Sequence, residues 1–401
     1  MNVDARTRRL LALTTVPKLG PVRIARLIAG LGDVESVLHA SEAQLARVRG
    51  IGPGLSRTIA RNLRDADRLA DQELARLEAC DAEPIAIGED RYPALLAPLR
   101  DAPIILTARG TAATEHDLRA VAIVGSRRCS AYGIEQSERF AGVFARAGYI
   151  VVSGGARGID AAAHRGALRQ GGRTVAVLGC GLARCYPPEH RELFDRIAAE
   201  GGAVMSELPA DTPPNADNFP ARNRIISGMS LGVLVVEAGE RSGALITARM
   251  AVEDHGREVF AIPGRIDAPA SRGTNALLRD AGAALVTSPE EVVELLDDAA
   301  GVARRGLGSG HLSDEAASLF SAPERDAPES STPHPGPSPQ ASTAPADPDH
   351  DEVLRALTGP TTLEALSVQT GLAPATLRAR LTMLEIAGRV QRSGDLVLPR
   401  R

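Results

Sequence analysis

Two arginines and an asparagine stand at the start of a predicted helix, in the segment formed by residues 219–230. A helix N-terminus offers unpaired N–H groups and the positive end of the helix dipole, so it suits the binding of a phosphate. Arg222 and Arg224 add full positive charges on either side of Asn223, and Phe219 precedes them. These residue types in this order indicate a site for a ligand that carries phosphate.

The chain places similar residues after several other predicted strands. Six short, β-branched runs alternate with helical segments, at 121–124, 149–152, 174–178, 203–205, 233–236 and 258–262. This βαβ pattern predicts a parallel, doubly wound α/β sheet, whose ligands bind beyond the carboxyl ends of the strands. The segments after the strands carry small residues, hydroxyls and arginines that suit an anion: Gly125, Ser126, Arg127, Ser153, Gly154, Arg157, Ser242, Gly243 and Thr247.

Enzyme classes with well-known signatures are disfavoured. The first strand is not followed by G-x-G-x-x-G, and the chain has neither a G-x-x-x-x-G-K-[ST] loop nor a G-x-S-x-G elbow. His164 and His190 lack the spacing of metal ligands. Asp160, Glu207 and Glu237 follow strands, where they cap helices or pair with arginines more readily than they act as acids or bases. We expect no catalytic residue, no metal and no other cofactor.

The overall charge is mildly acidic, with a net of −4 at pH 7 and a pI of about 6.1. A nucleic-acid site therefore has to be a local basic patch. The four cysteines form no C-x-x-C pair, which argues against a zinc site or a redox motif. No basic-then-apolar signal segment opens the chain and no apolar run approaches 18 residues, so we expect a soluble, cytoplasmic protein without a membrane partner.

The first hundred residues are predicted to form a helical domain with a duplicated motif. Residues 48–60 carry a helix–hairpin–helix signature of the SAM-like kind, whose hairpin Gly50-Ile51-Gly52 turns backbone amides outward. A weaker copy, with Lys18 in place of the first glycine, lies about 30 residues earlier. Tandem hairpins of this kind often bind the DNA backbone without reading sequence. Packing of the domain and protein binding are the alternatives.

The α/β domain is expected over residues 101–301, and the composition then changes. Residues 302–349 include a run rich in Pro, Ser, Ala and Asp, which cannot bury a core and predicts a disordered linker. Helical patterns at 352–357, 362–370 and 375–387 and a hairpin at 389–398 predict a winged helix over 350–401. The third of these helices carries Arg378 and Arg380, yet the domain's net charge of +2 fits protein docking as well as DNA binding.

An ordered set of motifs in this chain resembles that of the bacterial DNA-processing protein A family, also called DprA or Smf. The motifs occupy residues 121–127, 153–160, 219–230, 235–238, 242–247, 261–264 and 273–275. The resemblance implies an extended Rossmann-like fold that binds single-stranded DNA. It further implies delivery of that strand to the RecA recombinase during natural transformation, a homodimer as the working form, and no enzymatic activity.

By its match to the family, Arg127 would bind DNA together with Arg222 and Asn223, and Ser242-Gly243 would line the pocket. Two departures from the family pattern concern the affinity. Ala221 stands where an Arg or Lys is usual, and His190 stands where an Asn is common. Either the affinity for DNA is lower than in the family, or Arg128 or Arg241 supplies the missing charge. The rings of Tyr132, Tyr186 and Phe219 follow strands and could stack on bases or simply pack. Because Arg127 and Arg222 lie in a loop and at a helix start, we expect neither to be needed for folding.

Two other classes of function stay open. Related Rossmann-like proteins of the lysine-decarboxylase-like group hydrolyse nucleoside monophosphates, but their P-G-G-x-G-T-x-x-E signature is absent after the fifth strand, where residues 237–244 stand. The chain could also be an adaptor that joins proteins through its two end domains and leaves the pocket unused.

Overall fold

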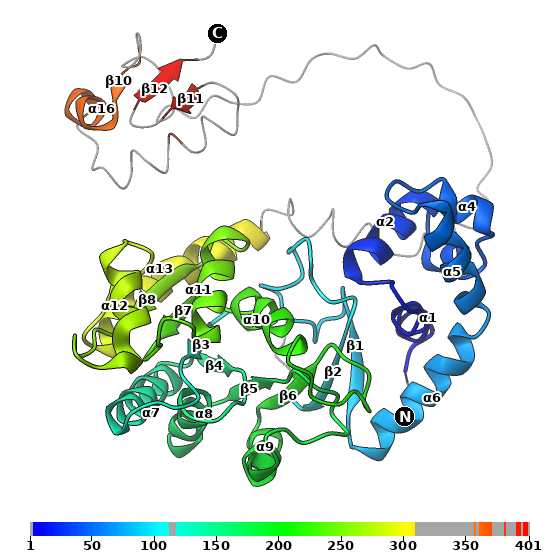
Figure 1. Ribbon diagram of the computed structural model, residues 1–401, viewed down its shortest axis with the longest axis horizontal. Coiled ribbons are helices and arrows are strands. Elements are labelled where there is room, and N and C mark those ends of the chain that lie inside the picture. The colour runs from blue at the N-terminus through cyan, green and yellow to red at the C-terminus, as the bar shows by residue number, and fades with distance from the viewer. Residues whose placement is uncertain are drawn as a thin grey trace. The chain divides into compact units, whose positions relative to one another are not determined.

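The computed structural model of this chain divides into two compact units, Met1–Glu324 and Arg325–Arg401, which we treat separately (Figure 1). It describes residues 3–111, 118–308, 357, 361–370, 381, 390–393 and 396–399. Among these residues, no helix is long and apolar enough to cross a membrane.

The first unit begins with six helices packed around a leucine-rich core. They are α1 (Ala5–Thr14), α2 (Pro21–Leu31), α3 (Val34–Leu38), α4 (Glu42–Ala46), α5 (Pro53–Leu63) and α6 (Ala66–Ala79). Side-chain caps fix several starts, because Asp4 accepts a hydrogen bond from the Thr7 amide and Ser41 forms a capping box with Gln44. The helical prediction for the first hundred residues is wrong beyond Ala79, since β1 (Glu83–Ala86) pairs with β2 (Ile105–Gly110). Pro84 is tolerated in β1 because this strand lies at the edge of the sheet.

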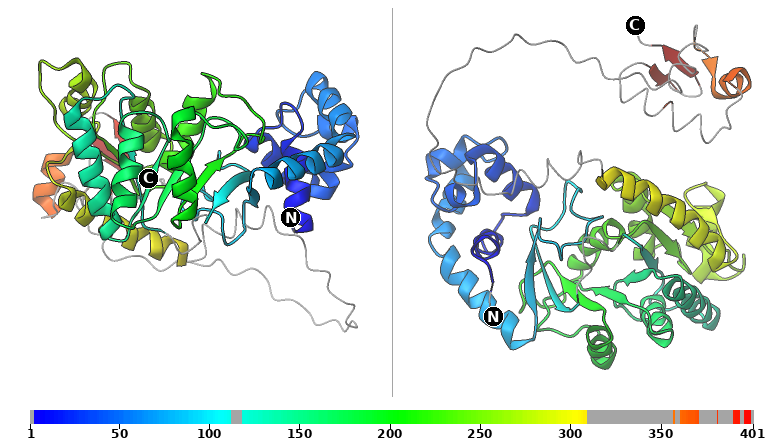
Figure 2. Two further views of the ribbon diagram at one scale, coloured as in Figure 1. Left: turned by 90° about the horizontal axis from the view of Figure 1, so that it is seen from below. Right: turned by 180° about the vertical axis from the view of Figure 1, so that it is seen from behind.

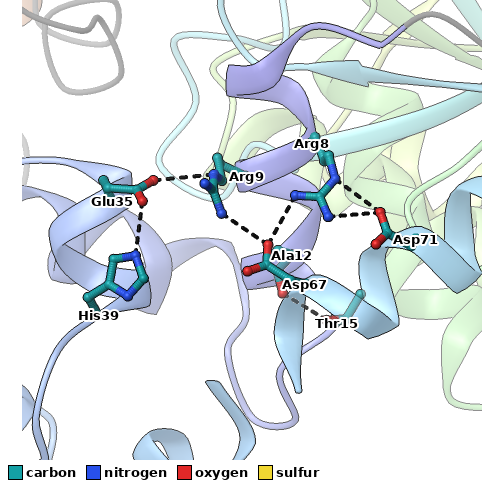
Figure 3. A network of polar contacts seen from close by, with 8 residues as sticks. All are labelled: Arg8, Arg9, Ala12, Thr15, Glu35, His39, Asp67 and Asp71. Atoms are coloured by element: carbon teal, nitrogen blue, oxygen red, sulfur yellow. Dashed lines mark hydrogen bonds and ion pairs between the residues drawn. The ribbon is translucent and has the colours of Figure 1, made fainter. Parts of the chain in front are cut away.

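Ion pairs join α1 to its neighbours (Figure 3). The Arg8 guanidinium lies 3.1 Å from Asp67 and 2.8 Å from Asp71 on α6. Arg9 lies 3.3 Å from Glu35 on α3 and also reaches Asp67 at 3.1 Å. These side chains are half-exposed, so each pair contributes little, about 0–1 kcal/mol, and the apolar core supplies most of the stability.

A nine-stranded sheet forms the centre of this unit, in the order β1-β2-β6-β5-β4-β3-β7-β8-β9. All six predicted strands are confirmed, as β3 (Ala120–Val124), β4 (Ile150–Ser153), β5 (Thr174–Val177), β6 (Ala203–Ser206), β7 (Gly232–Val235) and β8 (Glu258–Ala261). They run parallel, as does β9 (Ala284–Leu285), whereas β2 pairs antiparallel with both β6 and β1. The strand order reverses between β3 and β7, and such a switch point opens a crevice at the carboxyl ends of the strands.

Helices cover both faces of the sheet (Figure 2). Val121 and Ile123 of β3 face a core formed with α7 (Ala131–Arg146), α8 (Ile159–Arg169) and α13 (Pro289–Gly308). Ala122 and Val124 face the opposite core, which contains residues of α10 (Asn218–Gly228) and α11 (Gly243–Glu253). The remaining elements are α9 (Arg191–Ala199), α12 (Arg272–Arg279) and the 3₁₀ turns η1 (Pro188–His190) and η2 (Pro269–Ser271).

The second unit contains a small antiparallel sheet in the order β10-β12-β11. Its elements are β10 (Thr361–Thr362), α16 (Leu363–Thr370), β11 (Val390–Ser393) and β12 (Leu396–Pro399), which confirm the predicted second helix and the hairpin. The predicted helices at 352–357 and 375–387, with Arg378 and Arg380, lie mostly outside the described residues. So does the linker from residue 309 onward, whereas α13 continues to Gly308, beyond the expected start of the linker at 302.

One buried carboxylate ties α6 to the loop that follows β6, and it gives a test of this fold. Glu73 Oε1 accepts a hydrogen bond of 2.6 Å from the buried amide of Ala210. Glu73→Ala should lower the free energy of unfolding by about 1–3 kcal/mol, because the amide loses its partner away from water. Urea unfolding measures the change. Gln72→Ala, on the exposed side of the same helix, should shift it by no more than about 0.5 kcal/mol, and equal effects of the two substitutions would contradict the assignment.

Candidate functional site

A cavity of about 1040 Å³ opens at the carboxyl ends of β3 and β7, where the strand order reverses. Its wall comes from the segments that follow these two strands, from the first turns of α10 and α11, and from the loops that precede α8 and α10. Nine of the predicted site residues line it: Gly125, Ser126, Arg127, Phe219, Arg222, Asn223, Ser242, Gly243 and Thr247.

Close backbone packing fixes the segment after β3. The Ser126 amide donates a hydrogen bond of 2.7 Å to the carbonyl oxygen of Glu237, which follows β7. Glycines allow this approach, because a Cβ on Gly125 would lie 2.5 Å from Ile159. Gly158 has φ +75°, and a Cβ there would clash with the Ser126 carbonyl. The main chain is therefore rigid here, while the side chains of the next residues project outward.

A cation and two rings form one side of the cavity. The guanidinium carbon of Arg127 lies 4.9 Å from the centre of the Phe219 ring, within the range of a cation–π contact. The Phe219 ring lies 5.5 Å from that of Tyr186, at an interplanar angle of 43°. A Cβ on Gly179 would lie 2.7 Å from Phe219, so this glycine makes room for the ring. Tyr132, the third ring considered from the sequence, does not line the cavity.

Arg222 contributes a buried charge. Its side chain donates a hydrogen bond to the carbonyl oxygen of Val177 at the end of β5, and the residue is 5% exposed. Burial lowers the pKa of Arg222 to about 10, while the nearby Asp160 carboxylate opposes this shift. Burial also raises the pKa of Asp160, and Arg222 opposes that shift in turn. A Cβ on Gly154 would overlap both side chains. The premise that Arg222 lies outside the core is therefore wrong, and the structure instead predicts that its loss destabilises the protein.

Four other predicted site residues do not line this cavity. Ser153 is buried and its hydroxyl donates a hydrogen bond of 2.6 Å to the Ile123 carbonyl. Arg224 pairs with Glu207 and lies 3.6 Å from Asp101. Arg157 pairs with Glu189 at 2.5 Å, and together with Gly154 it lines a small hollow that shares Arg127, Tyr186 and Phe219 with the cavity. The charges of Arg157 and Arg224 are thus neutralised within the protein.

The carboxylates near the cavity have structural partners, as the sequence indicated. Asp160, in the first turn of α8, accepts a hydrogen bond of 3.2 Å from the Ala156 amide in the preceding loop. Glu237 accepts hydrogen bonds from the amide and the hydroxyl of Ser130, the N-cap of α7. Glu207 is held by Arg224.

Three exposed arginines remain, and they set the charge of the cavity. Arg127, Arg128 and Arg241 line it, and none of them forms an ion pair within the described part of the chain. Asp160 is the one carboxylate in the described lining, and it is buried beside Arg222. Arg128 and Arg241 therefore lie where they can supply the cation that Ala221 lacks. Such a surface attracts a ligand with several negative charges.

Comparison with known proteins identifies the family. The model of "DNA recombination-mediator protein A" matches residues 83–297, and that of the "DprA winged helix domain" matches residues 337–395. The chain belongs to the DNA recombination-mediator protein A family. It is 41% identical to Protein Smf of Escherichia coli K12 over 288 residues, which cover 72% of this chain and 74% of that protein. A relative from Mycobacterium tuberculosis H37Rv is 32% identical over 400 residues, which cover 96% of this chain and 92% of that protein.

The fold of the family is known from a solved structure. The X-ray structure of DNA processing protein A from Streptococcus pneumoniae matches this chain with a TM-score of 0.60 and 34% identity, and the match covers 73% of this chain and 98% of that one. Together with the winged helix match at the C-terminus, it confirms the predicted α/β class and the C-terminal domain type.

The buried position of Arg222 predicts that its substitution destabilises the protein more than substitution of the exposed Arg127 does. Arg222→Met should lower the free energy of unfolding by about 3 kcal/mol or more, because Asp160 is left as an uncompensated buried charge. Arg127→Ala should cost less than about 1 kcal/mol. Chemical unfolding measures both. Adding Asp160→Asn to Arg222→Met should recover part of the loss, and strictly additive effects would show that the two residues do not interact.

Proposed function

We propose that this protein binds single-stranded DNA in the cavity and acts as a recombination mediator, loading RecA onto incoming single strands during natural transformation. The observation that carries the proposal is the Arg127 guanidinium, exposed and resting on the Phe219 ring at the cavity wall. Single strands bind where a positively charged groove runs beside aromatic surfaces, since their phosphates and bases are both accessible. Duplex DNA offers its phosphates but keeps its bases stacked.

The charge of the cavity supports a ligand with several phosphates. The cavity of about 1040 Å³ has room for nucleotides, and exposed arginines stand at its wall. These charges, rather than the volume, favour a polyanion. Binding requires no catalytic group, and the carboxylates that line or adjoin the cavity are engaged in caps and ion pairs. A non-enzymatic role follows from this proposal.

The names of the relatives agree with a role in recombination. The matching family model is that of a recombination mediator, and the Streptococcus pneumoniae R6 relative, 44% identical over 211 residues, is a DNA processing protein. A mediator must hold the strand and contact RecA. A homodimer would present two cavities to one strand and raise the local concentration of bound DNA.

The cavity model predicts how salt and substitutions affect single-strand binding. With about four phosphates neutralised, log K should fall with log salt at a slope of roughly −3. Arg127→Ala combined with Phe219→Ala should weaken binding to labelled oligo-dT by at least about fivefold, since stacking contributes about 1–3 kcal/mol per base. Fluorescence anisotropy measures both quantities.

A matched control separates the cavity from general charge. Arg139→Ala removes one charge from an exposed position on α7 that does not line the cavity, so it should leave the affinity almost unchanged. A flat salt response, or equal losses in the control and the cavity variant, would exclude the cavity as the single-strand site. Binding of nucleoside monophosphates with their hydrolysis would favour the enzyme alternative.

The mediator role predicts faster RecA action on covered strands. The protein should accelerate RecA-dependent strand exchange on DNA already coated with single-strand-binding protein, because it holds the strand where RecA must nucleate. Arg127→Ala/Phe219→Ala should abolish the acceleration. An unchanged exchange rate, with single strands demonstrably bound, would assign the protein to storage or protection of DNA instead.

A further inference from the structure

Two hairpins with the same backbone geometry precede the helices α2 and α5. The turn residues Lys18 and Gly50 have φ of +69° and +89°. In each hairpin, the residue after the turn donates a backbone hydrogen bond of 3.0 or 3.1 Å to the carbonyl of a buried valine, Val16 or Val48. Few residues other than glycine adopt a positive φ, so Lys18 keeps a conformation its side chain disfavours. The hairpin around Lys18, which matches the motif less well in sequence, therefore has the same turn geometry as the hairpin around Gly50.

The glycines of these hairpins leave the main chain uncovered. Gly20 and Gly52 are the N-caps of α2 and α5, and each is followed by a proline. A Cβ at either position, or at Gly54, would meet no atom within 4 Å. Packing within the chain therefore does not require glycine there. The bare main chain allows another molecule to approach closely.

The surface around the hairpins is strongly basic. Residues 16–64 contain eight Lys and Arg residues and three acidic residues, a net of +5 in a chain whose total is −4. All eight cationic side chains are exposed, and within the described residues Arg57 alone among them forms an ion pair, with Glu42 at 3.3 Å. The other two acids are engaged, because Asp33 caps α3 and Glu35 pairs with Arg9. The eight cations are Lys18, Arg23, Arg26, Arg47, Arg49, Arg57, Arg61 and Arg64.

Three of these arginines form a row beside a groove. Arg57, Arg61 and Arg64 line a hollow of about 610 Å³ between α5 and the segment that leads into α4. Glu42 and Asp67 also line it, and both already pair with arginines. At 1.5 Å per residue the row is roughly 10 Å long. One strand of B-DNA carries a phosphate every ~3.4 Å along the axis, so the row spans about three phosphates. Arg61 and Arg64 have no ion pair within the described residues and are free to contact phosphates, whereas Arg57 has to exchange its Glu42 partner.

The scarcity of aromatic rings indicates which nucleic acid fits. The first 91 residues contain no Phe, Tyr or Trp, and the one aromatic ring among them is the imidazole of His39, which lies 2.9 Å from Glu35. A single strand needs stacking surfaces for its bases, which the cavity has and this surface lacks. A duplex needs only contacts to its phosphates. We propose that the two hairpins and the α5 row form a second nucleic-acid site, which binds the backbone of duplex DNA without reading its sequence.

The test compares two triple variants of the full-length protein on a labelled 30-base-pair duplex. Arg57→Ala/Arg61→Ala/Arg64→Ala should weaken duplex binding by about tenfold or more and make the salt slope shallower by about 2 to 3. Its affinity for oligo-dT should stay unchanged. The control, Arg139→Ala/Arg146→Ala/Arg165→Ala, removes the same charge from exposed positions on α7 and α8 and should retain duplex binding.

A second variant tests the hairpin itself. Gly52→Asp places a good N-cap residue at a position with φ −75° and open space, so the helix should be retained while the carboxylate repels phosphate. Duplex affinity should fall several-fold with an unchanged circular dichroism spectrum. The proposal is overturned if the wild-type protein does not bind the duplex. It is also overturned if both hairpin-region variants bind it normally, or if Arg127→Ala/Phe219→Ala alone abolishes duplex binding.

Discussion

The position of Arg222 is the constraint on which the rest of the cavity depends. Its guanidinium is removed from water, donates a hydrogen bond to the Val177 carbonyl and lies near the buried Asp160 carboxylate. Removing an arginine from water is costly, and an unpaired buried charge costs several kcal/mol. Residue 154 must therefore be glycine, and α10 is fixed against the ends of β5 and β4. Because the Asp160 carboxylate is buried beside Arg222, the two together add little net charge to the cavity, and the exposed arginines supply that charge.

Around Arg222, the wall of the cavity combines a closely packed backbone with exposed arginine side chains. The backbone after β3 is locked by the Ser126–Glu237 hydrogen bond and by glycine contacts. Arg127, Arg128 and Arg241 project from such loops as exposed side chains that can adapt to phosphates. A rigid frame with adaptable cations suits a flexible strand that is bound without regard to its sequence.

Much of this arrangement could be predicted from the sequence, because it follows from local patterns and one topological rule. Short β-branched runs predict the six parallel strands. Because ligands bind at the carboxyl ends of such strands, the sequence also predicts that Arg127, Arg222 and Ser242 share one site. The strands β1, β2 and β9 were not predicted, since β9 has only two exposed residues and β1 contains a proline. The SAM-like domain boundary at residue 100 stays a prediction.

The environment of single arginines could not be predicted in the same way. The pairs Arg157–Glu189 and Arg224–Glu207 join residues 32 and 17 positions apart, and no local pattern indicates them. The burial of Arg222 did have a signal. Arg222 precedes the buried Ile225 and Ile226 by three and four residues, so all three lie on one face of α10.

Photochemical crosslinking tests the central claim most directly. Oligo-dT that carries 5-iododeoxyuridine is bound to the full-length protein, irradiated, and the crosslinked peptides are identified by mass spectrometry. If the cavity is the single-strand site, the crosslinks fall on Tyr186 or Phe219, the two rings that line it, and disappear in Phe219→Ala/Tyr186→Leu. Crosslinks confined to the unit Arg325–Arg401, with none in the cavity, would contradict the account.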